Sequence, residues 1–66
     1  MKIEVNGVAH ELPPSETIEG LLARLGLAGH PCAVEVNRSV VPKRDHAQAH
    51  LRDGDRIEIV TLVGGG

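Results

Sequence analysis

The sequence of 66 residues predicts an α+β domain in which one main helix packs across a mixed sheet of four to five strands. Three patterns predict this fold class: an alternating hairpin at the start, an apolar stripe at helical spacing, and a strongly apolar segment near the end. A helix as short as the stripe allows does not persist alone in water. We therefore expect it to lie against the sheet.

The hairpin is predicted over residues 1–12. Residues 1–5 and 8–12 alternate apolar and polar side chains, and Asn6-Gly7 separates them. Asn-Gly is the strongest short hairpin signal, because both residues tolerate a positive φ. A two-residue turn places Val5 opposite Val8, and two prolines end the second strand.

The helix follows after a short polar segment. Thr17 is the favoured N-cap and Ser15 the alternative, because a hydroxyl oxygen accepts a hydrogen bond from an otherwise free amide of the first turn. Gly26 suits the left-handed position that follows a last helical turn. The apolar stripe has the spacing i, i+3, i+4 and i+7, and it consists of Ile18, Leu21, Leu22 and Leu25.

Three further strands are predicted after the helix, over residues 32–37, 40–41 and 56–63. The second of them is very short and stops at Pro42, which suits the edge of a sheet. Asp45 is expected to cap a brief helical turn over residues 46–50.

The last predicted strand is apolar on both faces. Its alternation gives one face with Ile57, Ile59 and Thr61 and another with Glu58, Val60 and Leu62. Such a strand is central in its sheet, or its outer face meets a partner. A central last strand that runs parallel to the first gives a β-grasp, or ubiquitin-like, topology. We expect residues 1–63 to form this domain and residues 64–66 to form a flexible C-terminal glycine tail.

Composition excludes several classes of function. A net charge of −2 and the absence of Phe, Tyr and Trp argue against a nucleic-acid-binding protein. The lone Cys32 forms no internal disulfide, and a structural role is favoured for it. No apolar run approaches the length of a membrane span, and residues 1–5 read as a strand rather than a signal peptide, so a cytoplasmic protein is expected.

The titratable residues predict neither an enzyme nor a metal centre. His46 and His50 have a spacing that can bind a metal on one helical face, but Ala47 stands where a zinc protease places a Glu. Two solvated histidines are the favoured interpretation. Asp53-Gly54-Asp55 is interpreted as a turn and not as part of a calcium loop.

The remaining distinctive group is a carboxylate at Gly66, which follows Gly64 and Gly65. A frayed end would also explain three terminal glycines. A carboxylate is a poor acyl donor until it is activated, for instance as an acyl adenylate formed with ATP. A narrow active site admits a chain end only if it is thin, and residues without a Cβ meet that requirement.

The order and spacing of several segments resemble those of ThiS-type sulfur carrier proteins of thiamin biosynthesis over nearly the whole length. The segments that carry the resemblance are Asn6-Gly7, Thr17-Ile18 with Leu21-Leu22 and Leu25, residues 34–37, residues 40–43, residues 51–60, and Val63-Gly64-Gly65-Gly66. One departure is the lack of a tryptophan at residues 45–47, where family members often carry one. Without this tryptophan, the local packing around residues 45–47 is expected to differ from that of such family members.

The resemblance implies a protein co-substrate rather than an enzyme. A ThiF-like adenylyltransferase would adenylate Gly66, and a cysteine desulfurase or another persulfide donor would replace AMP with sulfur. A ThiG-like thiazole synthase would accept the sulfur from the resulting thiocarboxylate. ATP is used by the activating partner, so no cofactor is expected on this chain.

We further expect Val60 and Leu62, with Val63 beside the tail, to dock these partners, because exposed apolar patches usually mark binding sites. Three alternatives stay open: a molybdopterin synthase small subunit, a ubiquitin-like modifier joined to lysines, and a β-grasp interaction domain with an inert tail.

Overall fold

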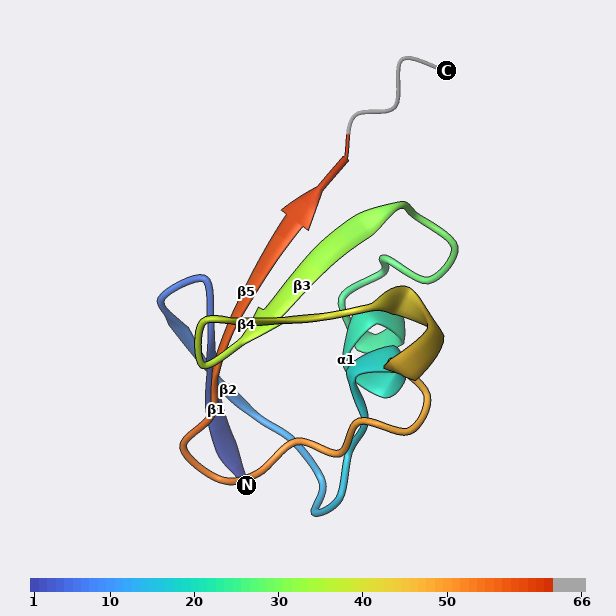
Figure 1. Cartoon of the computed structure of the whole chain (residues 1–66). Coiled ribbons are helices and arrows are strands. Elements are labelled where there is room, and N and C mark those ends of the chain that lie inside the picture. The colour runs from blue at the N-terminus through green and yellow to red at the C-terminus, as the bar shows by residue number, and fades with distance from the viewer. Residues whose placement is uncertain (63–66) are drawn as a thin grey trace.

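The computed structural model describes residues 1–62 and contains a mixed five-stranded sheet with one helix packed across it (Figure 1). The elements in chain order are β1 (Lys2–Val5), β2 (Val8–Glu11), α1 (Ile18–Arg24), β3 (Cys32–Val36), β4 (Ser39–Val41), the 3₁₀ turn η1 (Lys43–Asp45) and β5 (Arg56–Thr61). The predicted α+β class is confirmed.

The strand order is β2-β1-β5-β3-β4. The first and last strands are parallel neighbours, whereas β1 with β2, β3 with β4, and β3 with β5 are antiparallel. The central β5, the edge position of β4 and the predicted hairpin register, with Val5 opposite Val8, are therefore confirmed. This order is the predicted β-grasp topology.

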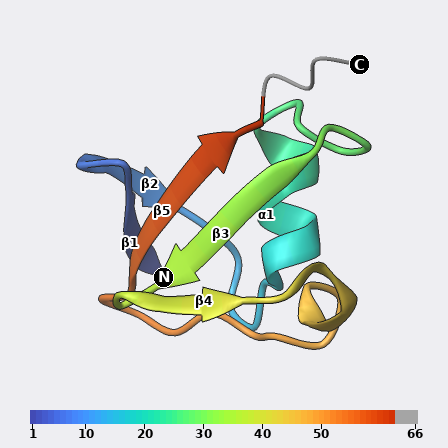
Figure 2. The ribbon, with the colours of Figure 1, turned by 45° about the horizontal axis from the view of Figure 1, so that its top comes forward.

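The core lies between α1 and the face of the sheet that α1 covers (Figure 2). It is aliphatic, as a sequence without aromatic residues requires. Its buried side chains are Ile3, Val5, Leu12, Ile18, Leu21, Leu22, Val34, Leu51, Ile57 and Ile59. Alternation then directs the residues between these buried positions, such as Glu35 and Glu58, to the opposite, open face of the sheet.

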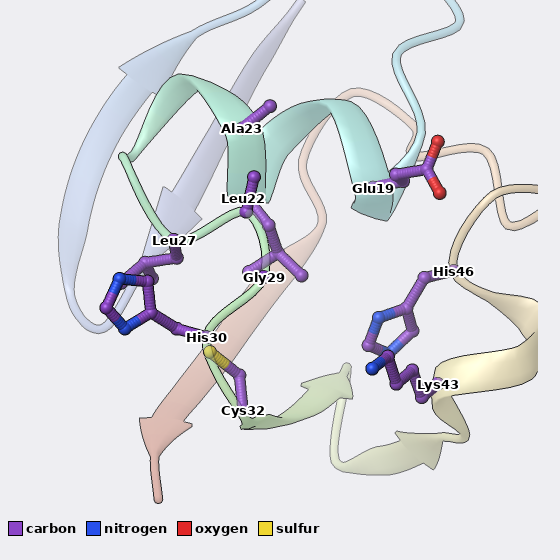
Figure 3. Close-up of a pocket in the computed structure, with 10 residues that line it drawn as sticks. Glu19, Leu22, Ala23, Leu27, Gly29, His30, Cys32, Lys43 and His46 are labelled. Atoms are coloured by element: carbon purple, nitrogen blue, oxygen red, sulfur yellow. The ribbon is translucent and has the colours of Figure 1, made fainter.

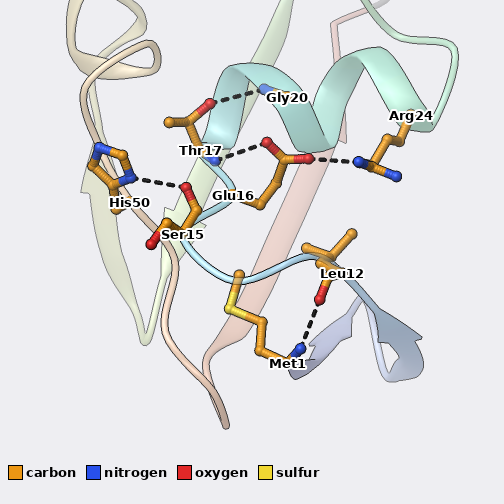
Figure 4. A network of polar contacts seen from close by, with 8 residues as sticks. All are labelled: Met1, Leu12, Ser15, Glu16, Thr17, Gly20, Arg24 and His50. Atoms are coloured by element: carbon orange, nitrogen blue, oxygen red, sulfur yellow. Dashed lines mark hydrogen bonds and ion pairs between the residues drawn. The ribbon is translucent and has the colours of Figure 1, made fainter.

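Both ends of α1 use the residues that the sequence predicted. The Thr17 hydroxyl accepts a hydrogen bond from the Gly20 amide at 3.1 Å, so Thr17 is the N-cap (Figure 4). At the other end Gly26 adopts a φ of +76°. The amide of Leu27 bonds the Leu22 carbonyl at 2.8 Å, and the amide of Gly26 bonds that of Ala23 at 3.1 Å. This pair of bonds is a Schellman motif.

The segment between η1 and β5 differs from the prediction. Asp45 does not cap a helix over residues 46–50; it ends the turn η1. The carbonyls of the following residues serve the helix instead, because His46 accepts from the Glu19 amide and Ala49 from the Ile18 amide, each at 3.0 Å. The first turn of a helix leaves its amides without partners inside the helix, and the carbonyls of this segment accept their hydrogen bonds.

Each strand also differs from its predicted bounds by one or two residues at one end. The third strand ends at Val36 rather than at residue 37, and β5 ends at Thr61, so Leu62 lies beyond the strand. Val63, the tail residues Gly64, Gly65 and Gly66, and the predicted boundary between domain and tail lie outside the described residues.

Candidate functional site

The site predicted from the sequence has a described part, which is the end of β5, and a part beyond residue 62. Strand β5 is held by neighbours on both sides, β1 and β3. Thr61 is the ladder partner of Cys32, and one step further the Leu62 amide donates to the Pro31 carbonyl at 2.9 Å. The backbone is thus fixed to the body as far as the last described residue.

Asn6 extends the pairing of β1 with β5 beyond the strand itself. Its side chain accepts a hydrogen bond from the Ile59 amide at 2.9 Å and donates one to the Ile59 carbonyl at 3.1 Å. In this way an amide side chain imitates a strand backbone. Asn6 also lies in the hairpin turn, with a φ of +49°. One residue therefore forms the turn and binds β5.

The side chain of Asn37 also binds β5, at the start of the strand. Its side-chain oxygen accepts from the Arg56 amide at 3.0 Å, and its side-chain nitrogen donates to the Asp55 carboxylate at 3.0 Å. Asn37 also has a positive φ, of +50°. The sequence placed Asn6 in a turn and Asn37 at the end of a strand, and predicted no bond from either side chain. An Asn at such a turn is the one available signal, and it does not reveal which strand the side chain will bind.

Two of the predicted docking residues lie at the end of β5 and just beyond it. Val60 lies directly opposite Ala33 of β3 and is 60% exposed, and Leu62 is 52% exposed. Isolated exposed apolar residues are normal, but Val60 lies on the open face of β5 and Leu62 follows two residues later, just beyond the strand. The predicted exposure of Val60 and Leu62 is confirmed, while their role in docking stays a prediction.

The two histidines that were considered as metal ligands differ in exposure and in hydrogen-bond partner. His50 is exposed and bonds the Ser15 carbonyl through Nδ1 at 2.9 Å, and it belongs to no helix (Figure 4). His46 is 6% exposed, so the expectation that it is solvated is wrong. Its Nε2 donates to the Val41 carbonyl at 3.0 Å, because a carbonyl only accepts. Among residues 1–62 no group of three or more metal-binding side chains forms.

A hollow of about 420 Å³ lies beside His46, between α1, the loop after it, and η1 (Figure 3). Leu22, Ala23 and Leu27 make it apolar on one side, while Glu19, Lys43 and His46 stand on the other. Cys32 also lines it, partly buried against the core. None of the predicted docking residues lines this hollow, and we assign it no chemistry.

Known proteins share this fold and part of its sequence. The model of the ThiS family matches residues 3–66. The sulfur carrier protein ThiS of Escherichia coli is 30% identical over 66 residues, which cover 100% of both chains. A crystal structure of the thiamine biosynthesis protein ThiS from Geobacter metallireducens superposes with a TM-score of 0.84 at 29% identity, again over 100% of both chains.

A thiazole synthase from Paramagnetospirillum magneticum is 44% identical over all 66 residues of this chain, and one from Magnetococcus marinus is 42% identical. The chain spans about a fifth of the length of these two proteins, 20% in each. No helix within residues 1–62 is long and apolar enough to cross a membrane. The family model, the full-length sequence match and the shared fold agree, and the chain belongs to the ThiS family.

Proposed function

We propose that this protein is the sulfur carrier that supplies the thiazole-forming step of thiamin biosynthesis. The observation that carries the proposal is the match with the sulfur carrier protein ThiS of Escherichia coli over the full length of both chains. The described structure supports it, because β5 leads directly to the predicted tail and is anchored as far as Leu62.

The chemistry belongs to Gly66 and requires a free carboxyl group there. A carboxylate oxygen attacks the α-phosphorus of ATP, pyrophosphate leaves, and an acyl adenylate forms on a ThiF-like adenylyltransferase. A persulfide sulfur, supplied by a cysteine desulfurase or a related donor, then attacks the acyl carbon and displaces AMP. A second thiol reduces the sulfur–sulfur bond and leaves the thiocarboxylate on Gly66.

A ThiG-like thiazole synthase is the acceptor of this sulfur. Support comes from the two thiazole synthases that contain a segment similar to this entire chain within their own length. In this scheme the protein is a co-substrate, ATP is bound by the adenylyltransferase, and no cofactor resides on the carrier. A cytoplasmic location remains a prediction from the sequence.

Intact-mass analysis tests the proposal. The purified chain is incubated with the cognate adenylyltransferase, ATP and a sulfide source, and we expect a mass gain equal to the difference between one sulfur and one oxygen atom. A variant without Gly65 and Gly66 is the matched control and gains nothing. An unchanged mass of the full chain, with an adenylyltransferase that is active on another carrier, contradicts the proposal.

The predicted docking residues need a separate test. Leu62→Glu places a charge on the exposed side chain, while the backbone bond from its amide to Pro31 is kept. We expect binding to the adenylyltransferase to weaken by about tenfold or more, because a buried charge without a partner is costly. The free energy of unfolding should change by no more than about 0.5 kcal/mol. Unchanged binding would show that Leu62 lies outside the interface.

A further inference from the structure

The open face of the sheet carries two glutamates that face each other. Glu35 of β3 and Glu58 of β5 are direct partners in the antiparallel ladder. Their neighbours in sequence, Val34 and Ile57, are buried on the other face, so both carboxylates project from the open face. Like charges directly opposite each other destabilise a sheet. The pair therefore opposes folding in the isolated chain.

The described part of the chain offers these carboxylates no ion pair. The ion pairs formed within residues 1–62 join the N-terminus to Glu11, Arg24 to Glu16, and Arg56 to Glu4. Arg56 lines a shallow depression with Glu58, but its guanidinium bonds Glu4 at 3.2 Å. Arg38 lines the same depression and makes no ion pair with Glu58.

Apolar side chains flank the acidic pair on the same face. Val40 of the edge strand is the ladder partner of Glu35 and is 70% exposed. Toward the end of β5 the face continues with Ala33, Val60 and Leu62, which we call the apolar strip. The strip extends from the acidic pair to Leu62, the last described residue.

We infer that this face docks an apolar surface that carries a basic side chain, on the enzyme that adenylates the tail. Arginine fits best, because its planar guanidinium offers parallel N–H donors to two adjacent carboxylates. The cation relieves the repulsion between Glu35 and Glu58 when the two surfaces meet. An apolar surface without a cation would bury both carboxylates unpaired, so the pair also selects against wrong partners. The inference rests on the proposed function for the identity of this enzyme.

The double variant Glu35→Gln with Glu58→Gln tests the inference, because it removes both charges and keeps the shape. We expect the dissociation constant for the cognate adenylyltransferase to rise by about tenfold at low salt. Added salt should weaken binding of the natural chain far more than that of the variant, because it screens the ion pair. The melting temperature of the variant alone should stay equal or rise, since the repulsion is gone.

A charge-matched control carries Glu11→Gln and Glu19→Gln, at the far edge strand and on the helix. It should bind like the natural chain. Equal weakening by the control, unchanged binding of the test variant, or a lower melting temperature of the test variant would each overturn the inference. The mass assay separates the two proposals. If the natural chain gains sulfur while the test variant binds normally, the carrier function stands and only the acidic-pair contact is wrong.

Discussion

The two faces of the sheet follow the same alternation and have opposite properties. The face under α1 is largely buried and mostly aliphatic, with Ile57 at 1% exposure. The open face one residue further along the same strands carries the acidic pair and exposed valines. The difference teaches that a single strand, β5, supplies both core side chains and the exposed surface that leads to the last described residue. A docked partner would thus contact the central strand of the sheet.

The comparison is tested most strongly by substitutions to alanine on the two faces of β5. Ile57→Ala should lower the free energy of unfolding by about 2–5 kcal/mol, because it removes buried methyl groups and leaves a cavity. Val60→Ala on the open face should change it by no more than about 0.5 kcal/mol. Urea denaturation of both variants measures this. Similar losses would mean that the open face also contributes to the core.

A smaller effect is expected where the turn residue Asn6 holds β5. Asn6→Gly keeps the positive φ and removes both side-chain hydrogen bonds to Ile59, so the unfolding free energy should fall by about 1–3 kcal/mol. Hydrogen exchange of the Ile59 amide should become faster. Arg38→Gly is the matched control, because Arg38 has a φ of +70° and no hydrogen bond of its side chain is found within residues 1–62. If Asn6→Gly were as stable as the natural chain, the clamp on β5 would contribute nothing.

The helix that covers the inner face offers a test of about 1 kcal/mol. Gly20 lies in α1, where Gly is about 1 kcal/mol less favourable than Ala. A Cβ at this position would overlap the Glu16 carboxylate, which bonds Arg24 and the Thr17 amide. Gly20→Ala should therefore stabilise the chain by about 1 kcal/mol only when combined with Glu16→Ala. An equal gain with Glu16 present would show that this carboxylate moves aside freely.

The smallest effect is the pH dependence that Glu16 causes. The hydrogen bond from Arg24, followed by that from the Thr17 amide, holds the pKa of Glu16 below its ordinary value of 4.5. A lowered pKa in the folded state stabilises the chain above pH 4.5, and this contribution is lost as the pH falls through the lowered pKa. The melting temperature of Glu16→Gln should differ from that of the natural chain at neutral pH, and the difference should shrink in acid. A constant difference would contradict the shift.

Local signals in the sequence predicted most of the fold. Asn6-Gly7 predicted the hairpin register, and Thr17 and Gly26 marked the two ends of α1. The two apolar faces of the last strand predicted a central strand or one that meets a partner, and the structure places it at the centre. Each of these signals acts within a few residues of the structure that it produces. The tail at Gly64–Gly66 was also chosen from sequence, through the family resemblance, and its chemistry stays a proposal.

The sequence by itself determined the alternation of β5, and with it which residues enter the core and which face outward. Only the tertiary structure decided the use of residues 46–50, the burial of His46, the clamping of β5 by Asn6 and Asn37, and the meeting of Glu35 with Glu58. These features join residues that are remote in sequence or direct a backbone group to another element. Hydrophobic periodicity does not predict such pairings, because the two partners come together only after the chain has folded.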